Sequence, residues 1–269
     1  MILVGDNQLS RQYDTINLYR RGASATIELN RPERMNAWNE QFAADLVDAI
    51  KLTGADPEVR AVLVTGAGRA FSAGADLKDR DPGDLDLYRT LTERYHPIIN
   101  GLRELPKPVV AGVNGPAAGI GLSLALACDL VVAAESAFFQ LAFVNIGLVP
   151  DGGSSVFVPA RVGFTRAAEL ALLGERLPAA KALDWGLINR VYPDASFAAE
   201  TAALVDKLAV GPTQSYAGTK RQLNQWLYRN MAEQLEFEAT TQQQMAGSAD
   251  FAEGVQSFTE KRPPNFTGA

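Results

Sequence analysis

Residues 107–122 read K-P-V-V-A-G-V-N-G-P-A-A-G-I-G-L, a pattern in which a short apolar strand leads through a loop of small residues into a helix. The β-branched run at 109–113 predicts a buried strand, and 119–127 predicts a helix. The small residues between them let a ligand approach the backbone closely. The stretch therefore predicts a strand-loop-helix unit whose loop is suited to binding.

The same alternation continues on both sides of this unit. We expect strands at 15–19, 25–29, 61–65 and 130–133, and helices at 40–53 and 85–105. After Pro150 the strand signal falls to 187–191, whereas 165–173, 179–185 and most of 197–260 are predicted to be helical. Repeated βα units with buried strands indicate an α/β fold. We divide it into a core over residues 1–195 and a helical region over 196–269.

Composition excludes several classes of function. A 269-residue chain with 47% hydrophobic residues can bury a large core, and its formal charge of −6 disfavours a nucleic-acid binder. The first ten residues lack a basic segment followed by a continuous apolar one, so no secretory signal is expected. The longest apolar runs, 122–127 and 130–134, are shorter than the roughly 20 residues of a membrane span. We expect a soluble protein with no membrane partner.

Cys128 is the single cysteine and His96 the single histidine. One cysteine excludes an intrachain disulfide and a cysteine-based metal cluster. One histidine makes a multi-histidine metal site or a Ser-His-Asp triad a poor prediction. We therefore predict a metal-free protein of the reducing cytoplasm.

Two loops with small residues each follow a β-rich run. The first is G-R-A-F-S-A-G-A-D-L at 68–77, and the second is N-G-P-A-A-G-I-G-L-S at 114–123. A helix N-terminus such as the second supplies unpaired N–H donors and a partial positive charge. Two such donors aimed at one carbonyl oxygen form an oxyanion hole, which is worth a few kcal/mol per donor. Each loop alone is also explained as an ordinary tight turn.

A third segment, V-P-D-G-G-S-S at 149–155, places Asp151 between a proline and two glycines after an apolar run. An aspartate in this position can cap the helix that follows. It can also act as the acid and base of an active site. The residues themselves leave both roles open.

Taken together, several segments resemble the enoyl-CoA hydratase/isomerase superfamily, the crotonases. They are L-N-R-P-E-R-M-N-A-W (29–38), A-F-S-A-G-A-D-L (70–77), residues 107–122, A-C-D-L (127–130), I-G-L-V-P-D-G-G (146–153) and F-T-E-K-R-P-P-N-F (258–266). The resemblance implies a ClpP-like spiral of ββα units with a C-terminal helical trimerisation region, assembled as a homotrimer or as a hexamer of two trimers. It also implies an acyl-CoA or enoyl-CoA thioester as substrate, with coenzyme A as part of that substrate and no bound cofactor.

The resemblance assigns roles by position. The backbone amides of Ala75 and Ile120 are expected to hold the thioester oxygen, with Asp151 as the catalytic carboxylate. The remaining expected contacts are to coenzyme A, with Lys261 and Arg262 reaching it from a neighbouring subunit. The resemblance assigns the phosphates to Arg31 and Arg34. It assigns the adenine and pantetheine to Ala73, Gly74, Asp76 and Leu77.

The same comparison favours one reaction. Family hydratases use two glutamates, and Ser123 and Phe143 stand at those positions here. Asp151 matches the carboxylate of family isomerases, and the closest resemblance is to the ring-epoxide isomerases of phenylacetyl-CoA breakdown. One carboxylate can remove a proton and return it elsewhere on the same dienolate. An apolar wall of Phe143, Phe139 and Ile120 is expected to raise the pKa of that carboxylate.

Three alternatives remain open at this level. Family dehalogenases of 4-chlorobenzoyl-CoA use an aspartate at the Asp151 position as a nucleophile and a histidine near the position of His96 to activate water. An atypical hydratase would use Asp151 alone. A non-catalytic acyl-CoA binder would use neither residue for chemistry, and His96 would then be a partly buried helix residue.

Overall fold

A computed structural model describes residues 7–79 and 86–269 of the chain, and the statements below concern these residues. The first residue of the predicted helix at 85–105 lies outside them, and so do six of the ten residues that argue against a secretory signal. In the described part of the chain, no helix combines the length and apolar content that crossing a membrane requires.

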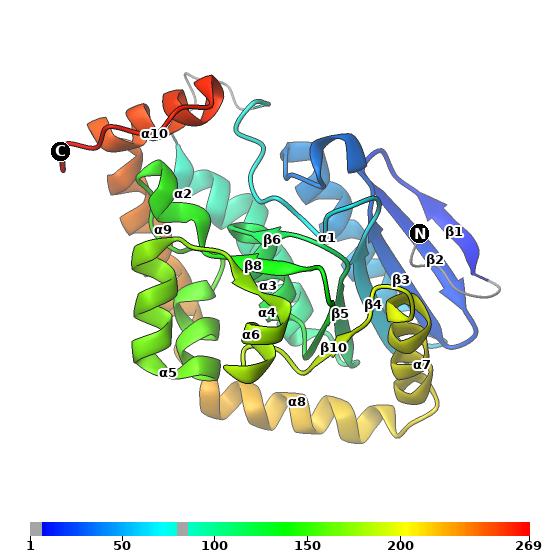
Figure 1. Ribbon diagram of the computed structural model, residues 1–269. Coiled ribbons are helices and arrows are strands. Elements are labelled where there is room, and N and C mark those ends of the chain that lie inside the picture. Colours follow the sequence, from blue (N-terminus) through cyan, green and yellow to red (C-terminus); the bar gives the residue numbers. More distant parts are fainter. Residues whose placement is uncertain (1–6, 80–85) are drawn as a thin grey trace.

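A seven-stranded sheet forms the centre of the molecule (Figure 1). Its order is β1-β2-β3-β4-β5-β7-β10, in which β1, β2 and β3 pair antiparallel and the others pair parallel. Every residue of β3, β4 and β5 is buried, as expected for strands covered on both faces. The strands are β1 (Gln8–Gln12), β2 (Ile16–Arg21), β3 (Ser24–Leu29), β4 (Ala61–Gly66), β5 (Val109–Val113), β7 (Leu130–Ala134) and β10 (Arg190–Tyr192).

A smaller sheet lies beside the first and consists of β6 (Ala117–Ala118), β8 (Phe138–Gln140) and β9 (Leu177–Pro178). Isolated bridges from Trp38 to Ala75 and from Ser72 to Ala117 extend the same stack of strands. Successive turns of the chain add a strand to the large sheet and a short extended segment to the small one, and each turn also carries a helix. The chain therefore winds as the expected spiral of ββα units.

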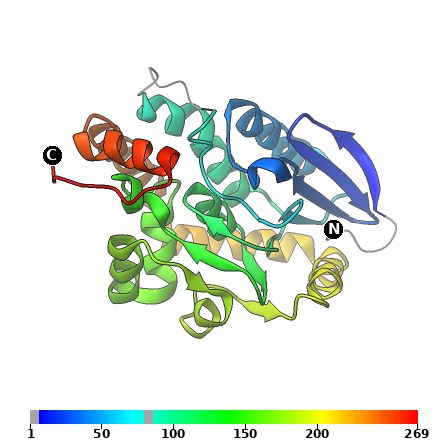
Figure 2. The same ribbon diagram turned by 45° about the horizontal axis from the view of Figure 1, so that its top comes forward.

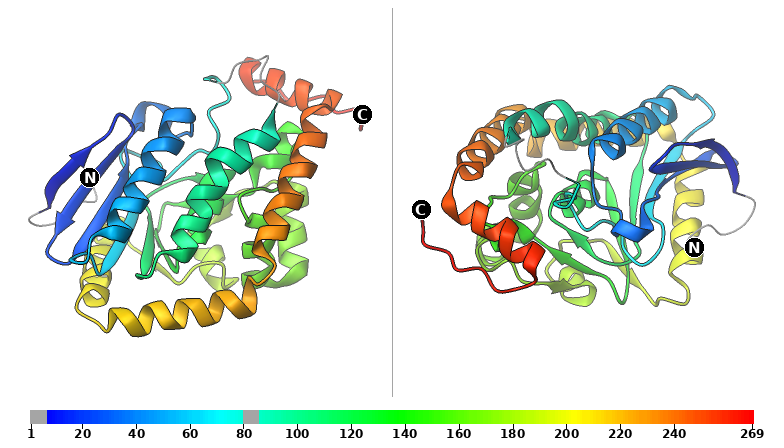
Figure 3. Two further views of the ribbon diagram at one scale, coloured as in Figure 1. Left: turned by 180° about the vertical axis from the view of Figure 1, so that it is seen from behind. Right: turned by 90° about the horizontal axis from the view of Figure 1, so that it is seen from above.

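Helices cover both faces of the large sheet. Helices α1 and α3 lie on one face, and α7 packs against β3, β4 and β7 on the other (Figure 3). The helices of the spiral are α1 (Glu40–Ala55), α2 (Leu87–Arg89), α3 (His96–Glu104), α4 (Ile120–Ala127), α5 (Ser154–Leu173) and α6 (Ala179–Asp184). A π-helix, Thr90–Tyr95, joins α2 to α3, and the 3₁₀ helices are η1 (Pro32–Arg34) and η3 (Ala142–Ile146).

The last quarter of the chain is helical and wraps around the spiral. It comprises α7 (Phe197–Ala209), α8 (Thr213–Leu227), α9 (Met231–Ala246) and α10 (Ala249–Glu260). Helix α8 runs along the lower edge of the view in Figure 1, and α9 then rises toward α2 and α5. Helix α10 and the N-terminal strands lie at opposite ends of the molecule (Figure 2).

The predicted helices and strands of the βα core are confirmed within two residues at most ends. The predicted start of a helix at residue 165 is wrong, because α5 begins at Ser154 and continues through Pro159 and a kink at Gly163. Those two residues disfavour a helix locally, and tertiary packing overrides them. Strands β1, β6, β8 and β9 were not predicted. The last three have only two or three residues each, and β1 is polar and exposed.

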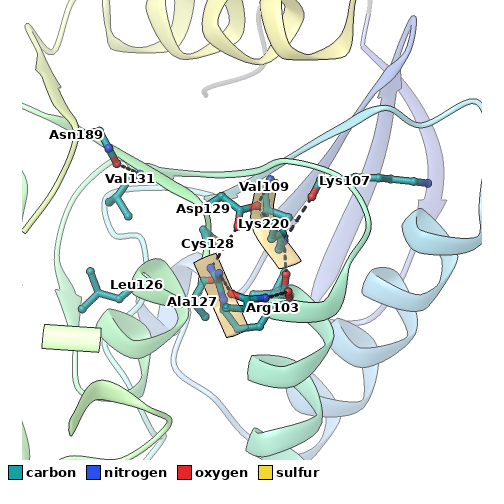
Figure 4. Close-up of polar contacts among 12 residues, drawn as sticks. Arg103, Lys107, Val109, Leu126, Ala127, Cys128, Asp129, Val131, Asn189 and Lys220 are labelled. Carbon is teal, nitrogen blue, oxygen red and sulfur yellow. Dashed lines mark hydrogen bonds and ion pairs between the residues drawn. The ribbon is translucent and has the colours of Figure 1, made fainter. Parts of the chain in front are cut away.

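One carboxylate connects α8 to the spiral (Figure 4). Lys220 of α8, 7% exposed, donates to Leu102 O at 2.7 Å and to Asp129 Oδ2 at 2.9 Å. Asp129 also accepts from Arg103 Nη1 at 3.2 Å and from the backbone N of Val109 at 2.9 Å. Asp129 therefore joins α3, β5 and α8 through contacts that are distant in sequence.

Replacing Asp129 by alanine leaves Arg103 and Lys220 without their shared carboxylate, so we expect the free energy of unfolding to fall by about 3–5 kcal/mol. Lys220→Met has a smaller expected effect because Asp129 keeps Arg103. Urea unfolding at one protein concentration measures both. Arg11 forms an exposed pair with Asp48, and the control Arg11→Met is expected to change stability by less than about 1 kcal/mol. Equal losses for Asp129→Ala and Arg11→Met would contradict the assigned role.

Candidate active site

A cavity of about 990 Å³ opens between the spiral and the C-terminal helices. Both loops with small residues reach it, and so do η3, the π-helix, α9 and the end of α10. One part of its wall is apolar and aromatic. That part includes Trp38, Leu87, Leu91, Tyr95, Phe143 and Leu148. The size and the mixture of apolar wall and polar groups are those of a small-molecule site.

The two loops meet at a pair of glycines that are 45 positions apart. Gly74 has a φ of +96°, and a Cβ there would lie 2.9 Å from Ala118 O and 3.7 Å from Gly119 Cα. Gly119 has a φ of +53°, and Phe143 lies 4.0 Å from the place of its missing Cβ. A side chain at Gly74 would strain the backbone and separate the loops. Glycine is therefore required where they touch.

Each of these glycines precedes a backbone amide that is available to a ligand. Ile120 N belongs to the first residue of α4, so it has no partner inside the helix. The bridge between Trp38 and this loop uses Gly74 O and Asp76 N, and it makes no hydrogen bond to Ala75 N. Within the described residues, neither amide has a backbone acceptor, and both residues line the cavity. The pair is suited to bind one oxygen that carries negative charge.

The turn that carries Asp151 packs against the start of α4. Gly152 and Gly153 have φ values of +60° and +82°, and a Cβ on Gly152 would lie 2.2 Å from Ile120 Cδ1. The backbone oxygen of Asp151 accepts from Ser123 Oγ and from Ser154 Oγ, each at 2.8 Å. These contacts hold the Asp151 backbone beside the second loop, and Asp151 lines the cavity with Ile120.

The Asp151 side chain is 5% exposed and has one hydrogen bond, from Gln242 Nε2 to Oδ2 at 2.8 Å. Oδ1 is buried without a partner among the described residues. The pKa of Asp151 is raised to about 8, chiefly by burial and then by the nearby charge of Glu238, and the hydrogen bond from Gln242 opposes both. A carboxyl group with this pKa can both accept and release a proton near neutral pH.

The capping role considered for Asp151 is not what the structure has. The N-cap residue of α5 is Gly153, which has no side chain that could cap the helix. Glu238 of α9 performs this function, because its carboxylate accepts from the backbone N of Gly153 at 2.7 Å and of Ser155 at 3.1 Å. The Asp151 carboxyl is therefore left for contacts with Gln242 and the cavity.

Asp151 differs from the other carboxylates of the cavity. Among the described residues, those others are Glu40, Asp76 and Asp79. Arg94 pairs with Glu40 at 3.1 Å, and Arg31 lies 3.1 Å from Asp76 and 3.7 Å from Asp79. No ion pair involves Asp151 within residues 7–79 and 86–269. Among the described lining carboxylates, Asp151 is therefore the one without an arginine partner.

The structure brings together most of the residues expected at the site. Ala73, Gly74, Ala75, Asp76, Leu77, Ile120 and Asp151 all line the cavity, as does Arg262. Arg31, Arg34 and Lys261 do not, and Arg31 instead holds Asp76 in place. Lys261 is exposed at the C-cap of α10. The assigned contacts with coenzyme A remain predictions.

The residues tied to other reactions lie in different surroundings. Ser123 is fully buried and bonds the Asp151 backbone, whereas Phe143 lines the cavity. Phe139, expected in the apolar wall, is buried in the core and does not line the cavity. His96 is also absent from the lining, and burial lowers its pKa to about 4, against the opposing charge of Glu236.

Sequence reasoning missed Glu238 and Gln242. Both belong to the helical region that we separated from the core, and they are 3% and 1% exposed. Their spacing of four residues places them on one face of α9. Two polar residues on an otherwise buried helix face were a usable signal, but nothing in the local sequence names their partners.

The buried carboxyl of Asp151 makes stability depend on pH. Its pKa of about 8 in the folded protein lies above the value of about 4 in an unfolded chain. The folded state therefore binds more protons between these limits, and stability falls as the pH rises through them. Asp151→Asn removes this dependence. We expect the Tm of the variant relative to wild type to rise between about pH 4 and pH 8 in scanning calorimetry.

Asp184 is exposed on α6, so Asp184→Asn serves as the control and is expected to follow the wild type at every pH. The direction of the change is the decisive observation. A difference in Tm between Asp151→Asn and wild type that stays constant, or shrinks, as the pH rises would contradict a raised pKa at Asp151.

Comparison with known proteins adds to this geometry. The family model of enoyl-CoA hydratase/isomerase matches residues 20–269. A probable enoyl-CoA hydratase of Rhodobacter capsulatus is 44% identical over 256 residues, which cover 95% of this chain and 99% of that one. The 1,2-epoxyphenylacetyl-CoA isomerase of Escherichia coli is 42% identical over 247 residues, or 90% of this chain and 94% of that one.

The fold is shared as well. The crystal structure of an enoyl-CoA hydratase from Mycobacterium avium subsp. paratuberculosis has a TM-score of 0.88 at 40% identity, covering 95% of this chain and 100% of that one. A 4-chlorobenzoyl coenzyme A dehalogenase of Arthrobacter is 34% identical over 241 residues, 88% of this chain and 87% of that one. The predicted crotonase fold and the resemblance to ring-epoxide isomerases are confirmed. The chain belongs to the enoyl-CoA hydratase/isomerase family.

Proposed function

We propose that this protein is an enoyl-CoA isomerase that shifts a double bond, or rearranges a ring epoxide, through one carboxylate. The observation that carries the proposal is the buried carboxyl of Asp151, which lines a cavity with two available backbone amides and has no cation partner among the described residues. A base, a site for an oxyanion and an apolar wall are what moving a proton on a thioester requires.

The proposed reaction uses these groups in sequence. The thioester oxygen binds between the amides of Ala75 and Ile120. The ionised carboxylate of Asp151 removes a proton from the carbon beside the carbonyl, and the electron pair moves onto the oxygen as a dienolate. The neutral acid then returns the proton to the γ carbon, which shifts the double bond. No bound cofactor is needed, because coenzyme A enters as part of the substrate.

Isomerisation is favoured over hydration by the number of acid and base groups. The two positions at which family hydratases carry glutamate hold Ser123, which is buried against the Asp151 backbone, and Phe143, which is apolar. Neither can activate water. A single carboxylate suffices for isomerisation because the proton that it takes is the one that it returns.

The same geometry disfavours a dehalogenase. That reaction would place His96 beside Asp151 to activate water, but His96 does not line the cavity and its pKa is lowered to about 4 by burial. Its neighbour Tyr95 lines the cavity instead. These positions support a proton transfer that involves Asp151 and no histidine.

The first test is incubation with trans-3-hexenoyl-CoA in H₂¹⁸O, followed by mass spectrometry and chromatography of the products. We expect trans-2-hexenoyl-CoA of unchanged mass. For Asp151→Asn, kcat is expected to fall by about 10²–10⁴-fold, because the lost group acts in the transition state. Affinity for the CoA ester is expected to stay within a few-fold.

Two outcomes would overturn the proposal. A product that gains one labelled water would make the protein a hydratase. Binding without turnover, equal in wild type and Asp151→Asn, would make it an acyl-CoA binder. Asp184→Asn, on the exposed face of α6, is the control for substitution of an aspartate that lies away from the cavity.

We also propose that the helical region joins chains into a homotrimer, two of which can form a hexamer. Helix α8 exposes Leu223, Trp226 and Leu227 at 52%, 77% and 46%, and Val210 before it is 78% exposed. So many large apolar side chains on one exposed helical region favour burial against another chain. A location in the reducing cytoplasm stays a prediction from the single cysteine.

Light scattering after size exclusion tests the assembly. Wild type is expected at three or six chain masses, and Trp226→Asp at one, because a carboxylate in a contact between chains would be buried without a partner. Leu9, exposed at 51% on β1 at the far end of the molecule, provides the control Leu9→Asp, for which the mass is expected to stay unchanged. A monomeric wild type would contradict this part of the proposal.

A further inference from the structure

Helix α9 presents two buried polar side chains, one helical turn apart, to the turn that carries Asp151. Glu238 and Gln242 are separated by 85 and 91 residues from the groups that they bind in that turn. In a helix that packs on a core, such positions are ordinarily apolar. Their polarity therefore has to be explained by the residues that they contact.

Gln242 uses both ends of its amide. Its Oε1 accepts from the backbone N of Val149 at 3.0 Å, and its Nε2 donates to Asp151 Oδ2 at 2.8 Å. The first contact determines which end of the amide faces Asp151, since only an acceptor can bind an N–H. The carboxyl is thus held through Oδ2, and Oδ1 is buried without a partner among the described residues.

Glu238 holds the backbone of the same turn. It accepts from the amides of Gly153 and Ser155 and from Ser155 Oγ, to which Gln234 Nε2 also donates at 2.9 Å. Gly152 and Gly153 are both in the left-handed region, where a chain has few local restraints. The two contacts to Glu238 supply a restraint directly after Asp151.

We propose that Glu238 and Gln242 are positioning residues for the proton transfer by Asp151. Through these two residues the C-terminal helical region orients the Asp151 carboxyl and sets its proton affinity. The inference rests on the proposed isomerase function. It makes α9 part of the active site, and it predicts that this helix must be docked before Asp151 can act.

The charges around Asp151 make the inference specific. Glu238 is the charged group that acts on it, while α4 presents the uncharged Ile120 and Ser123. The other charged groups that line the cavity belong to separate pairs or to its rim. They are Glu40, Asp76, Asp79, Arg94, Arg176 and Arg262. The hydrogen bond from Gln242 lowers the pKa of Asp151, and the charge of Glu238 raises it.

The two contacts therefore predict shifts of opposite sign. Gln242→Met removes a donor that favours the carboxylate, so the pKa of Asp151 is expected to rise by about one unit. Glu238→Gln removes a negative charge but keeps an acceptor oxygen for the helix amides, so the pKa is expected to fall by about one unit. A purely structural contact would change neither.

The experiment uses two readouts on the full-length protein. The first is kcat and KM for trans-3-hexenoyl-CoA from pH 6 to pH 10, where kcat/KM rises with ionisation of Asp151. The second needs no activity, because it follows the Tm of each variant, with and without Asp151→Asn, against pH. The matched controls on α9 are Gln244→Met and Glu233→Gln, both at exposed positions.

We expect the midpoint of both profiles to move up for Gln242→Met and down for Glu238→Gln, and to stay in place for the controls. For Gln242→Met, kcat is expected to fall about tenfold or more with KM nearly unchanged, as for a lost hydrogen bond to a charged group. Partial recovery in Gln242→Asn would indicate that the amide itself is needed. Unmoved midpoints in both variants would overturn the inference.

Failure of the proposed function gives a different result. A wild-type protein that leaves trans-3-hexenoyl-CoA unchanged at every pH would overturn the double-bond isomerase, and proton transfer by Asp151 on that substrate with it. The thermal profiles would still decide whether α9 controls the protonation of Asp151. Opposite shifts in those profiles together with turnover would support both proposals.

Discussion

The contact between two backbone loops at Gly74 and Gly119 is the constraint on which the rest of the structure depends. The loops can touch because Gly74 has no side chain and because Gly119 adopts a positive φ that favours glycine, and the contact places the amides of Ala75 and Ile120 at one cavity. The small sheet serves the same end, since the bridge from Ser72 to Ala117 aligns the two turns of the spiral. The spiral therefore brings two backbone amides to one cavity, an arrangement suited to binding an oxyanion.

The buried carboxyl of Asp151 is the second constraint on the structure, and its burial lowers the free energy of unfolding. Asp151 is desolvated, has one hydrogen bond and lies near a second buried acid, Glu238, whose own pKa is raised to about 7 by burial. Such an arrangement lowers stability at high pH. It persists because Glu238 and Ser123 hold the turn and Gln242 holds the side chain. Groups that destabilise the fold in this way often mark functional sites.

Much of the fold was predictable because its signals are local. Strand β5, the loop that follows it and helix α4 could be identified from residues 107–122, since apolar runs and small residues have their effect within a few positions. The start of α5 was not predictable. Pro159 and Gly163 disfavour a helix, and the contacts that stabilise it at Ser155 come from α9. Arg31, expected at a phosphate, is held by Asp76 of the neighbouring loop.

The sequence by itself determined the family, the two amide-bearing loops and the carboxylate at Asp151, because each is encoded in a contiguous motif. Only the tertiary structure decided what surrounds that carboxylate. Gln242 and Glu238 act across 91 and 85 residues, and no local pattern specifies a contact over that distance. His96 was excluded from the cavity for the same reason: the π-helix before it supplies the lining residues of this segment, and which side chains meet the site depends on packing. Proton affinity depends on burial and neighbouring charge, and both are properties of the folded chain.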